Sequence, residues 1–338
     1  MAYKVAYLFG AGATHAEVMN STENADEAFR EKYGLLISHV SKRVIKKVNE
    51  SVPWMRDHED IFASRKGTFN IELLISLFEN NRVPDHVIRK LKNAVHDDIK
   101  DVLSDNRIRK FYLHNALLEL HQKINEKEEL IGTISLNYDT VLDDAYKRND
   151  FVPHYCLSSE NREGIPLLKL HGSFDWVNGV SIDGRRRPID IIPIGMNKNY
   201  LFPPYNFVWA KAYELLKRCD VLRIIGCSLS QTDLGLIDLL FKSHSDKGSG
   251  IKLKVIDFQP QNGYHSIKTN YGFFPNIIEP NPPQERVNLN DPEELLIADI
   301  QMSDYENGNP FKIWLKAKAL SIFSESEIES TKYLKKCF

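Results

Sequence analysis

Five short apolar segments constrain the fold of this 338-residue chain more than any other feature. Each is brief, rich in β-branched residues and followed by turn-forming residues, which predicts a buried β-strand. Their near-continuous hydrophobicity favours a parallel sheet covered on both faces over a sheet with one solvated face. The predicted strands are 4–9, 130–136, 166–170, 220–225 and 251–258.

Helix-like segments alternate with these strands. Residues 140–147, 206–218 and 234–243 follow the second, third and fourth predicted strands. Strands that alternate with helices in this way predict βαβ units. The sequence therefore predicts an α/β fold, with a Rossmann-like doubly wound parallel sheet at its centre.

More than a hundred residues of different character separate the first predicted strand from the second. Residues 25–50 place apolar side chains at helical spacing opposite charged ones, which predicts a helix. Further helices are predicted at 69–81, 84–103 and 108–125. Because this stretch is too long for a simple crossover, we expect a large helical insertion packed beside the sheet.

The composition changes again after Pro280, where proline and asparagine precede predicted helices at 293–302, 310–322 and 326–336. These helices form a C-terminal helical appendage that either serves assembly or only covers a face of the sheet. The predicted domains are a core of residues 1–24 and 126–285, an insertion of 25–125 and a C-terminal region of 286–338.

The composition is that of a soluble globular protein, with 42% hydrophobic and 27% charged residues. The 44 basic residues nearly balance the 46 acidic ones, which argues against a general nucleic-acid surface. The amino terminus runs directly into glycine without the pattern of a secretory signal, and no apolar run approaches the length that spans a bilayer. We therefore expect a cytoplasmic protein with no membrane contact.

A glycine-rich turn ends the first predicted strand. Glycines at a strand-to-helix turn let the backbone approach a phosphate, and free amides at the helix start favour its negative charge. His15 stands where the full dinucleotide pattern has a small residue, so a turn that needs small residues only for packing is the alternative. The turn comprises Gly10, Ala11, Gly12, Ala13 and Thr14.

The next two predicted strands also end in polar residues. Asn137 and Asp139 follow the second strand, where ligands gather in open α/β folds, although Asp139 could instead cap the following helix. His171 follows the third strand and precedes a glycine, which leaves room for a substrate to reach a side chain that accepts protons near neutral pH. The alternative is a structural histidine.

The last two predicted strands end in a similar way. Gly226 and Ser228 follow the fourth strand and offer backbone and hydroxyl hydrogen bonds to phosphate or ribose. Asp257 ends the fifth strand with an acid that can accept hydrogen bonds from ribose hydroxyls. The alternatives are helix capping by Ser230 or Asp233 and a capping or solvent-facing role for Asp257.

In this order, the five strand ends resemble the sirtuin superfamily, and specifically its bacterial sirtuin-like branch found in antiphage defence proteins. The matching segments are 9–14, 133–144, 168–173 and 226–233, and the specific elements are Asn-Tyr-Asp at 137–139 and Leu-His-Gly at 170–172. The resemblance spans most of the chain up to about residue 258, outside the helical insertion.

The resemblance implies that the glycine-rich turn holds the phosphates of NAD. It implies that Asn137 lies beside the nicotinamide ribose, that Asp139 binds the nicotinamide carboxamide and that His171 deprotonates a ribose hydroxyl. It assigns the adenosine side to Gly226, Ser228 and Asp257.

One departure from the family pattern concerns cysteine. Protein-deacylating sirtuins usually carry a zinc module with two paired cysteine motifs between the histidine and the late glycine motif, and here that interval contains only Cys219. A four-cysteine zinc site therefore cannot be built there, which puts acyl-lysine binding in doubt. In the defence branch the same pocket hydrolyses NAD.

We therefore expect an NAD glycohydrolase that cleaves the nicotinamide–ribose bond and depletes NAD in antiphage defence. Its catalytic residues would be Asn137 and His171, with NAD as substrate and no metal. The alternatives are a module that senses NAD or ADP-ribose without turnover and, less favoured, a protein deacylase. We also expect a homo-oligomer, with a HerA-type ATPase as a candidate partner subunit.

Overall fold

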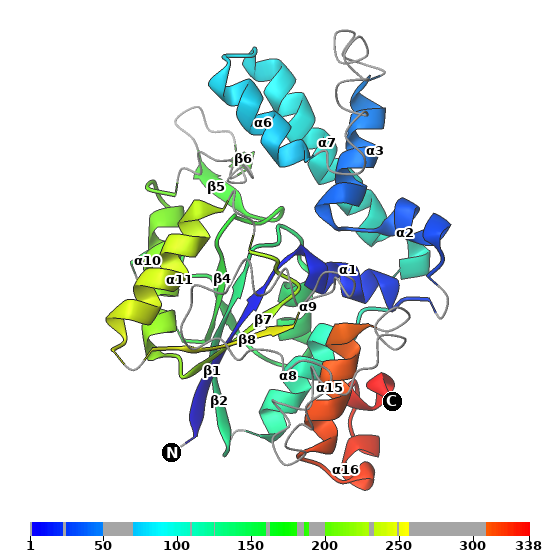
Figure 1. Cartoon of the computed structure of the whole chain (residues 1–338), viewed down its shortest axis with the longest axis vertical. Coiled ribbons are helices and arrows are strands. Elements are labelled where there is room, and N and C mark those ends of the chain that lie inside the picture. The colour runs from blue at the N-terminus through cyan, green and yellow to red at the C-terminus, as the bar shows by residue number, and fades with distance from the viewer. Residues whose placement is uncertain are drawn as a thin grey trace, which may run out of the picture.

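The computed structural model describes residues 2–22, 25–49, 70–108, 110–124, 126–159, 163–180, 186–188, 200–229, 233–248, 250–256 and 309–338. A six-stranded sheet with the order β3-β4-β2-β1-β7-β8 forms its centre, and all of its neighbouring strands are parallel (Figure 1). The strands are β1 (Tyr3–Phe9), β2 (Glu128–Ser135), β3 (Pro153–His154), β4 (Ile165–Lys169), β7 (Val221–Ile225) and β8 (Lys252–Ile256).

Strand β1 lies inside the sheet, and its side chains alternate between two hydrophobic cores. Val5, Tyr7 and Phe9 lie in one core, and Ala6 and Leu8 lie in the other. All five are fully buried. Because successive side chains of a strand point to opposite faces, a strand covered on both faces needs apolar residues at consecutive positions. This requirement explains the unbroken apolar run that marked the strand in the sequence.

The predicted α/β class and doubly wound parallel sheet are confirmed, and all five predicted strands are present. Strand β3, a two-residue edge strand that pairs with β4, was not predicted. Its first residue is Pro153, and proline is tolerated at a sheet edge because no ladder hydrogen bond needs its missing N–H. A separate antiparallel pair, β5 (Val177–Val180) and β6 (Arg186–Pro188), follows β4.

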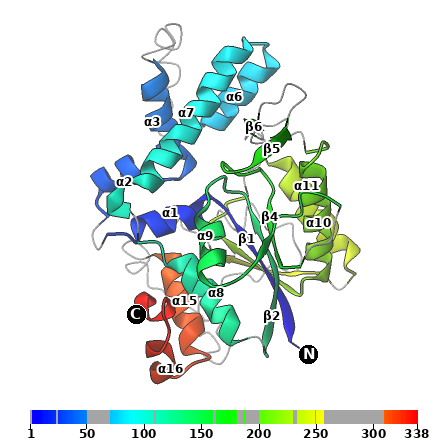
Figure 2. The same ribbon diagram turned by 180° about the vertical axis from the view of Figure 1, so that it is seen from behind.

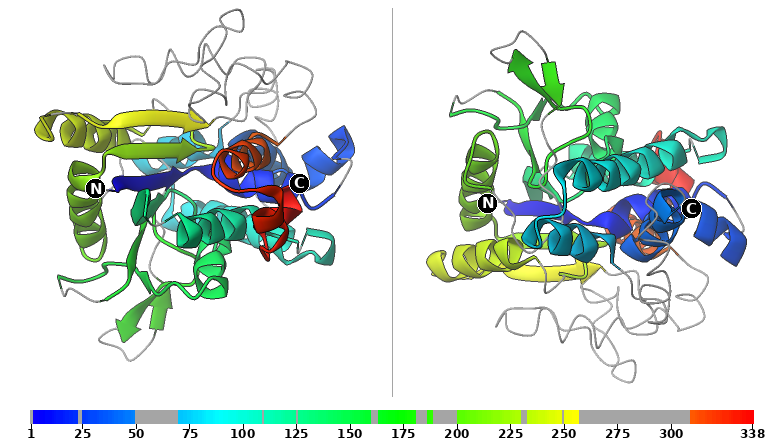
Figure 3. Two further views of the ribbon diagram at one scale, coloured as in Figure 1. Left: turned by 90° about the horizontal axis from the view of Figure 1, so that it is seen from below. Right: turned by 90° about the horizontal axis from the view of Figure 1, so that it is seen from above.

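Helices cover both faces of the sheet (Figure 3). The face of Ala6 and Leu8 is covered by α10 (Tyr205–Arg218) and α11 (Leu234–Asp246). The opposite face is covered by α8 (Leu113–Lys123), α9 (Val141–Arg148) and α15 (Pro310–Leu320), with α1 (Ala11–Met19) beside them. The helices predicted after the second, third and fourth strands correspond to α9, α10 and α11.

Most of the predicted insertion forms a group of helices above the sheet (Figure 2). Three of them, α3 (Ile37–Asn49), α6 (Ile71–Asn80) and α7 (Asp85–Ser104), share a hydrophobic cluster of their own. The single helix expected over 25–50 was wrong, because α2 (Glu27–Tyr33) ends before α3 begins. Gly34 separates them in an extended conformation, and a Cβ there would lie 2.5 Å from the Arg30 carbonyl oxygen.

The segment predicted as one helix over 108–125 is also divided. A 3₁₀ turn (Asn106–Ile108) ends before α8, which begins at Leu113 and packs against the sheet. The predicted helices at 69–81 and 84–103 correspond to α6 and α7.

At the C-terminus, α15 buries Phe311 and Trp314 in the same core as Tyr7 and Phe9. This helix therefore covers a face of the sheet, which is one of the two alternatives for the C-terminal region. The predicted helix 326–336 is shorter and divided into α16 (Glu325–Glu329) and a 3₁₀ turn (Leu334–Cys337). The predicted helix 293–302 lies outside the described residues. The domain limits remain predictions.

Within the described ranges, none of the helices is both long and apolar enough to cross a bilayer.

Candidate functional site

The carboxyl ends of β1 and β7 interlock through two glycines. The amide of Gly10 donates to the Ile225 carbonyl, and that of Gly12 donates to the Gly226 carbonyl, both at 2.9 Å. Gly226 has a φ of 62°, and a Cβ at this position would collide with the backbone of Gly12 and Ala13. A Cβ on Gly10 would lie 2.5 Å from the Gly226 carbonyl oxygen. The glycines therefore permit backbone packing between two loops, as the packing alternative predicted.

This packing limits which part of the glycine-rich turn a ligand can reach. Gly12, Ala13 and Thr14 are buried, whereas Ala11 is exposed at the start of α1. The amides of Gly12 and Ala13 already donate within the protein, the latter to the Gly10 carbonyl at 3.0 Å. An anion would therefore meet this helix at its exposed first residue.

Asn137 is fixed by the glycine-rich turn. Its Nδ2 donates to the Gly10 carbonyl and to Thr14 Oγ1, both at 2.9 Å. The Thr14 hydroxyl in turn donates to Asp139 Oδ2 at 2.9 Å. Because both amide hydrogens of Asn137 are used inside the protein, the part of its side chain that remains for a further hydrogen bond is its oxygen, an acceptor.

Asp139 is buried and engaged on both oxygens. Besides the bond from Thr14, its Oδ1 accepts from the Val141 amide at 3.0 Å, at the first turn of α9. Asp139 therefore bonds with the first residue of α9, although the N-cap is Thr140 and not Asp139 as the capping alternative had it, and Asp139 also links the β1 and β2 loops. Its role toward a ligand remains a proposal.

His171 lies after β4 and is only 4% exposed. The following residue, Gly172, has a φ of 89°, a conformation that favours glycine. The Nε2 of His171 lies 3.3 Å from Oδ2 of Asp233, which is the N-cap of α11. A buried imidazole beside a buried carboxylate is an arrangement suited to moving a proton.

Lys169, the last residue of β4, joins the two loops that carry Asn137 and His171. Its Nζ donates to the Asp139 carbonyl at 2.5 Å, to Asp143 Oδ2 at 3.0 Å and to Ser173 Oγ at 2.6 Å. Lys169 and Asp143 are almost completely buried, which makes the loss of either partner costly. The lysine therefore fixes the distance between the loops.

Aromatic side chains connect this site to the helical insertion. The ring of His96 on α7 lies against Phe174, with centroids 4.4 Å apart. Phe174 lies 5.7 Å from the ring of Tyr138, which is 6.2 Å from the His171 ring. A continuous set of rings thus leads from the insertion to the predicted base.

The structure brings most of the predicted site residues to one edge of the sheet. The glycine-rich turn, Asn137, Asp139 and Gly226 are linked by the hydrogen bonds given above. Ser228 is exposed after β7, and Asp257 lies outside the described residues. The roles of these residues toward a ligand remain proposals.

Lys169 was not predicted as a site residue, and Asp233 was predicted only as a helix cap. The signal for Lys169 was a charged residue inside the otherwise apolar run Leu167-Leu168-Lys169-Leu170. No comparable local signal links Asp233 with His171, because the contact joins two distant parts of the chain.

The described residues contain no group of three or more His, Cys, Asp or Glu side chains arranged to hold a metal ion. All four cysteines are buried and free, and burial raises the pKa of the Cys219 thiol to about 12.

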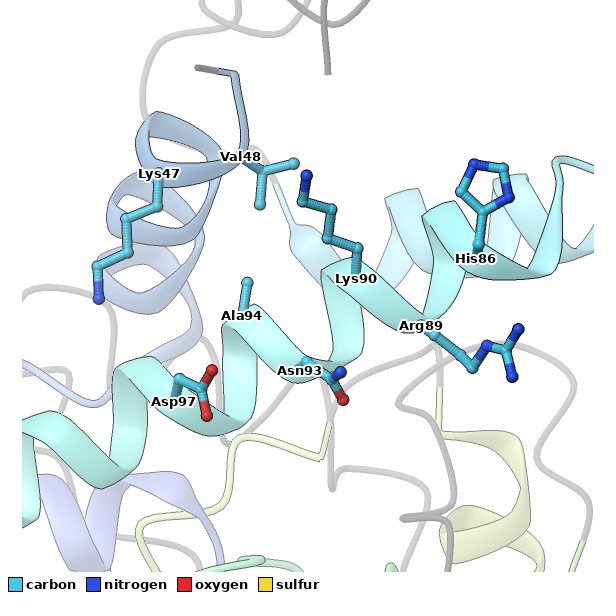
Figure 4. Close-up of a pocket in the computed structure, with 8 residues that line it drawn as sticks. All are labelled: Lys47, Val48, His86, Arg89, Lys90, Asn93, Ala94 and Asp97. Atoms are coloured by element: carbon cyan, nitrogen blue, oxygen red, sulfur yellow. The ribbon is translucent and has the colours of Figure 1, made fainter. Parts of the chain in front are cut away.

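A separate hollow of about 460 Å³ lies between α3 and α7 of the insertion (Figure 4). Its lining includes Lys47 from α3 and His86, Arg89 and Lys90 from α7, together with the acidic Asp97. The ammonium of Lys47 also lies 3.4 Å from a carboxylate oxygen of Asp98. This hollow is built by the insertion and contains none of the predicted site residues.

No protein-family model matches the sequence. No curated protein matches it either.

Solved structures of Sir2 proteins are similar to this chain at low identity. One is a Sir2 protein with a p53 peptide and NAD⁺, at 14% identity and a TM-score of 0.38, covering 75% of this chain and 81% of that one. Another is a complex of a Sir2 homologue with NAD, at 16% identity and a TM-score of 0.35, covering 76% and 78%. A likeness this remote assigns neither an activity nor a ligand to the chain.

Proposed function

We propose that this chain binds NAD at the carboxyl ends of its strands and hydrolyses the nicotinamide–ribose bond, giving nicotinamide and ADP-ribose. The observation that carries the proposal is the joint placement of an oriented amide oxygen on Asn137 and a buried imidazole–carboxylate pair at His171 and Asp233. These are the groups that orient a ribose, position water and accept a proton.

Cleavage of the nicotinamide–ribose bond needs few catalytic groups from the protein. Nicotinamide leaves NAD as a neutral molecule from a positively charged pyridinium, so the transition state resembles an oxocarbenium ion. The site must orient the ribose, keep the leaving group away and deliver water. The Asn137 oxygen would accept a hydrogen bond from the water or a ribose hydroxyl, and His171 would take the proton.

The remaining groups would bind the rest of NAD. The exposed start of α1 at Ala11 and the exposed Ser228 hydroxyl would meet the phosphates, since the neighbouring amides of the turn are bonded within the protein. Asp139 would hold the carboxamide through acceptor capacity that its two hydrogen bonds leave available. Gly226 would let the loops after β1 and β7 pack against each other. Asp257 would bind the adenosine side of NAD.

The test is to incubate the purified protein with NAD and to identify the products by mass. Asn137→Ala and His171→Ala should each lower turnover by about 10²–10⁴-fold while the protein stays folded. Asn115→Ala is a matched control, because Asn115 is a buried asparagine on α8 that donates to the Phe111 carbonyl. Undiminished NAD consumption by either site variant would refute the proposal.

Calorimetry with NAD separates the proposal from its main alternative. Tight binding without nicotinamide release would make the chain a sensor of NAD or ADP-ribose. Nicotinamide release that depends on an added acyl-lysine peptide would make it a deacylase.

We extend the proposal to a role in antiphage defence, in which NAD depletion is switched on by assembly with further copies of the chain or with a HerA-type ATPase. The insertion offers a surface for such contacts, since Leu73 and Leu77 of α6 are 42% and 47% exposed. Light scattering with and without NAD tests self-assembly, and a chain that stays monomeric in both would contradict it.

A further inference from the structure

Asp233 contacts the predicted base from a distant part of the sequence. Its Oδ2 lies 3.3 Å from Nε2 of His171, and the two residues are 6% and 4% exposed. We infer that Asp233 is a positioning residue that acts through His171 by determining which nitrogen of the imidazole carries the hydrogen. The inference rests on the NAD hydrolysis proposed above.

The tautomer of His171 follows from the negative charge that its Nε2 atom faces. An ionised carboxylate only accepts hydrogen bonds, so the Nε2 atom that faces Asp233 carries the hydrogen when the ring is neutral. The lone pair then lies on Nδ1, which is the atom that takes the proton of a ribose hydroxyl or of water. The imidazolium formed in this step is positively charged, and the Asp233 carboxylate stabilises it.

Helix α11 holds the carboxylate in place. Asp233 is the N-cap of this helix, and its Oδ1 accepts from the Leu236 amide at 3.3 Å. The Oδ1 atom of Asp233 therefore caps the helix, while its Oδ2 atom faces His171. Asparagine caps a helix about as well as aspartate, so capping does not by itself require a buried negative charge at this position.

Among the described residues, Tyr138 and Lys169 also lie close to this part of the site. Tyr138 approaches the imidazole with its ring, at a centroid distance of 6.2 Å. Lys169, on the strand that leads into His171, directs its ammonium at Asp143, Ser173 and the Asp139 carbonyl. An aspartate in direct contact favours the protonated imidazole, so neutralising it should lower the pKa of His171.

The experiment compares Asp233→Asn with Asp238→Asn. The first substitution keeps the shape and the N-cap but removes the charge. The second changes an exposed aspartate on the same helix and serves as the matched control. The His171 ring is followed by NMR titration, with its signals assigned from the His171→Gln variant.

We expect the Nε2–H tautomer in the unchanged protein. In Asp233→Asn, the pKa of His171 should fall by about one unit or more, whereas Asp238→Asn should leave it unchanged. In the NAD assay, Asp233→Asn should lower kcat by about 10²–10⁴-fold with little change in KM, because the charge acts mainly in the transition state. The acid limb of its pH profile should move to lower pH with the pKa.

Two results would overturn the inference. One is an Nδ1–H tautomer in the unchanged protein, which can be measured even if Asp233→Asn fails to fold. The other is an unchanged His171 titration in folded Asp233→Asn, and in that case NAD hydrolysis by the unchanged protein would still stand. A lowered pKa in a protein that releases no nicotinamide would instead support the His–Asp pair and refute the proposed hydrolysis.

Discussion

Two groups of buried charge lie on the same sheet and differ in what they hold together. The strand-end cluster joins loops at the carboxyl ends of the strands and consists of Lys169, Asp143, His171 and Asp233. The sheet-face cluster lies under α8 and α15 and consists of Arg223, Glu128, Lys318, Tyr7 and His121.

The sheet-face cluster is a hydrogen-bond network between regular elements. Arg223 donates to both oxygens of Glu128, at 2.7 and 2.8 Å, and Lys318 donates to Glu128 at 2.8 Å. Arg223 also donates to the Tyr7 hydroxyl at 2.8 Å, so that this hydroxyl is left to donate to His121 Nε2 at 2.7 Å. These bonds connect β7, β2, β1, α8 and α15, and the cluster therefore serves stability.

The strand-end cluster also reaches loops. Lys169 forms an ion pair with Asp143 of α9 and bonds with the backbone of one loop and a side chain of the other, and Asp233 contacts a histidine. In both clusters a buried lysine forms an ion pair between regular elements, Lys318 with Glu128 of β2 and Lys169 with Asp143 of α9. Only Lys169 also hydrogen-bonds with the loops at the carboxyl ends of the strands, and it therefore holds those loops in place as well.

Replacing the lysine of each cluster gives the largest expected difference. Lys169→Met should lower the free energy of unfolding by about 3–5 kcal/mol, because Asp143 loses its buried partner. It should also lower NAD turnover by about 10²-fold or more, because the loops that carry Asn137 and His171 shift relative to each other. Turnover is measured at a temperature where circular dichroism shows the variant to be folded.

Lys318→Met is the matched control, since Lys318 is also buried but bonds with Glu128. It should reduce stability and leave turnover per folded molecule unchanged. Normal turnover by folded Lys169→Met would remove the distinction between the clusters.

Arg223→Met tests the sheet-face cluster alone. Loss of the guanidinium should lower the free energy of unfolding by about 3–5 kcal/mol, because Glu128 and Tyr7 lose buried hydrogen bonds. Chemical denaturation measures this change. The folded variant should consume NAD normally. A loss of turnover as large as that of Lys169→Met would contradict the distinction between the sheet-face and strand-end clusters.

Two glycines with positive φ test the backbone packing at the strand ends. Gly226→Ala should cost about 1–3 kcal/mol of unfolding free energy, since it combines strain at φ 62° with a collision against the β1 loop. Gly248, at φ 74°, has open space around its Cβ position. Thermal unfolding of both variants should show the smaller loss for Gly248→Ala, and equal losses would show that the interlocked loops contribute nothing.

The smallest expected effect near neutral pH is a change in the pH dependence of stability. Burial, assisted by the nearby Arg223 charge, lowers the pKa of His121 from 6.5 to about 3. The unfolded state therefore binds more protons between these values, and stability is lost as pH falls from about 6.5 toward 3. His121→Gln should flatten this slope by up to about 1.4 kcal/mol per pH unit in denaturation curves. An identical slope in the variant would show that His121 is not held neutral.

The sheet could be predicted because its signal is local. A strand buried on both faces needs consecutive apolar residues, and a glycine such as Gly10 stands out at the turn that follows. The two-residue β3 and the break at Gly34 have weaker local signals, because a short edge strand needs few apolar residues and one glycine is tolerated in a helix.

The site was predictable only as residue types at strand ends. Asn137 and His171 stood out because polar residues follow buried strands there. The contacts that orient them, from Thr14 to Asn137 and from Asp233 to His171, join segments far apart in sequence and depend on how the loops pack. The role of Lys169 could not be predicted, because a charged residue in a strand gives no indication of the partners that would make its burial possible.

Product analysis in ¹⁸O-labelled water tests whether the strand-end cluster positions Asn137 and His171 to hydrolyse NAD. We predict that the unchanged protein releases nicotinamide together with ADP-ribose carrying one ¹⁸O atom, and that Asn137→Ala releases neither while Asn115→Ala behaves normally. The absence of nicotinamide with the unchanged protein, or equal release by Asn137→Ala, would contradict this prediction.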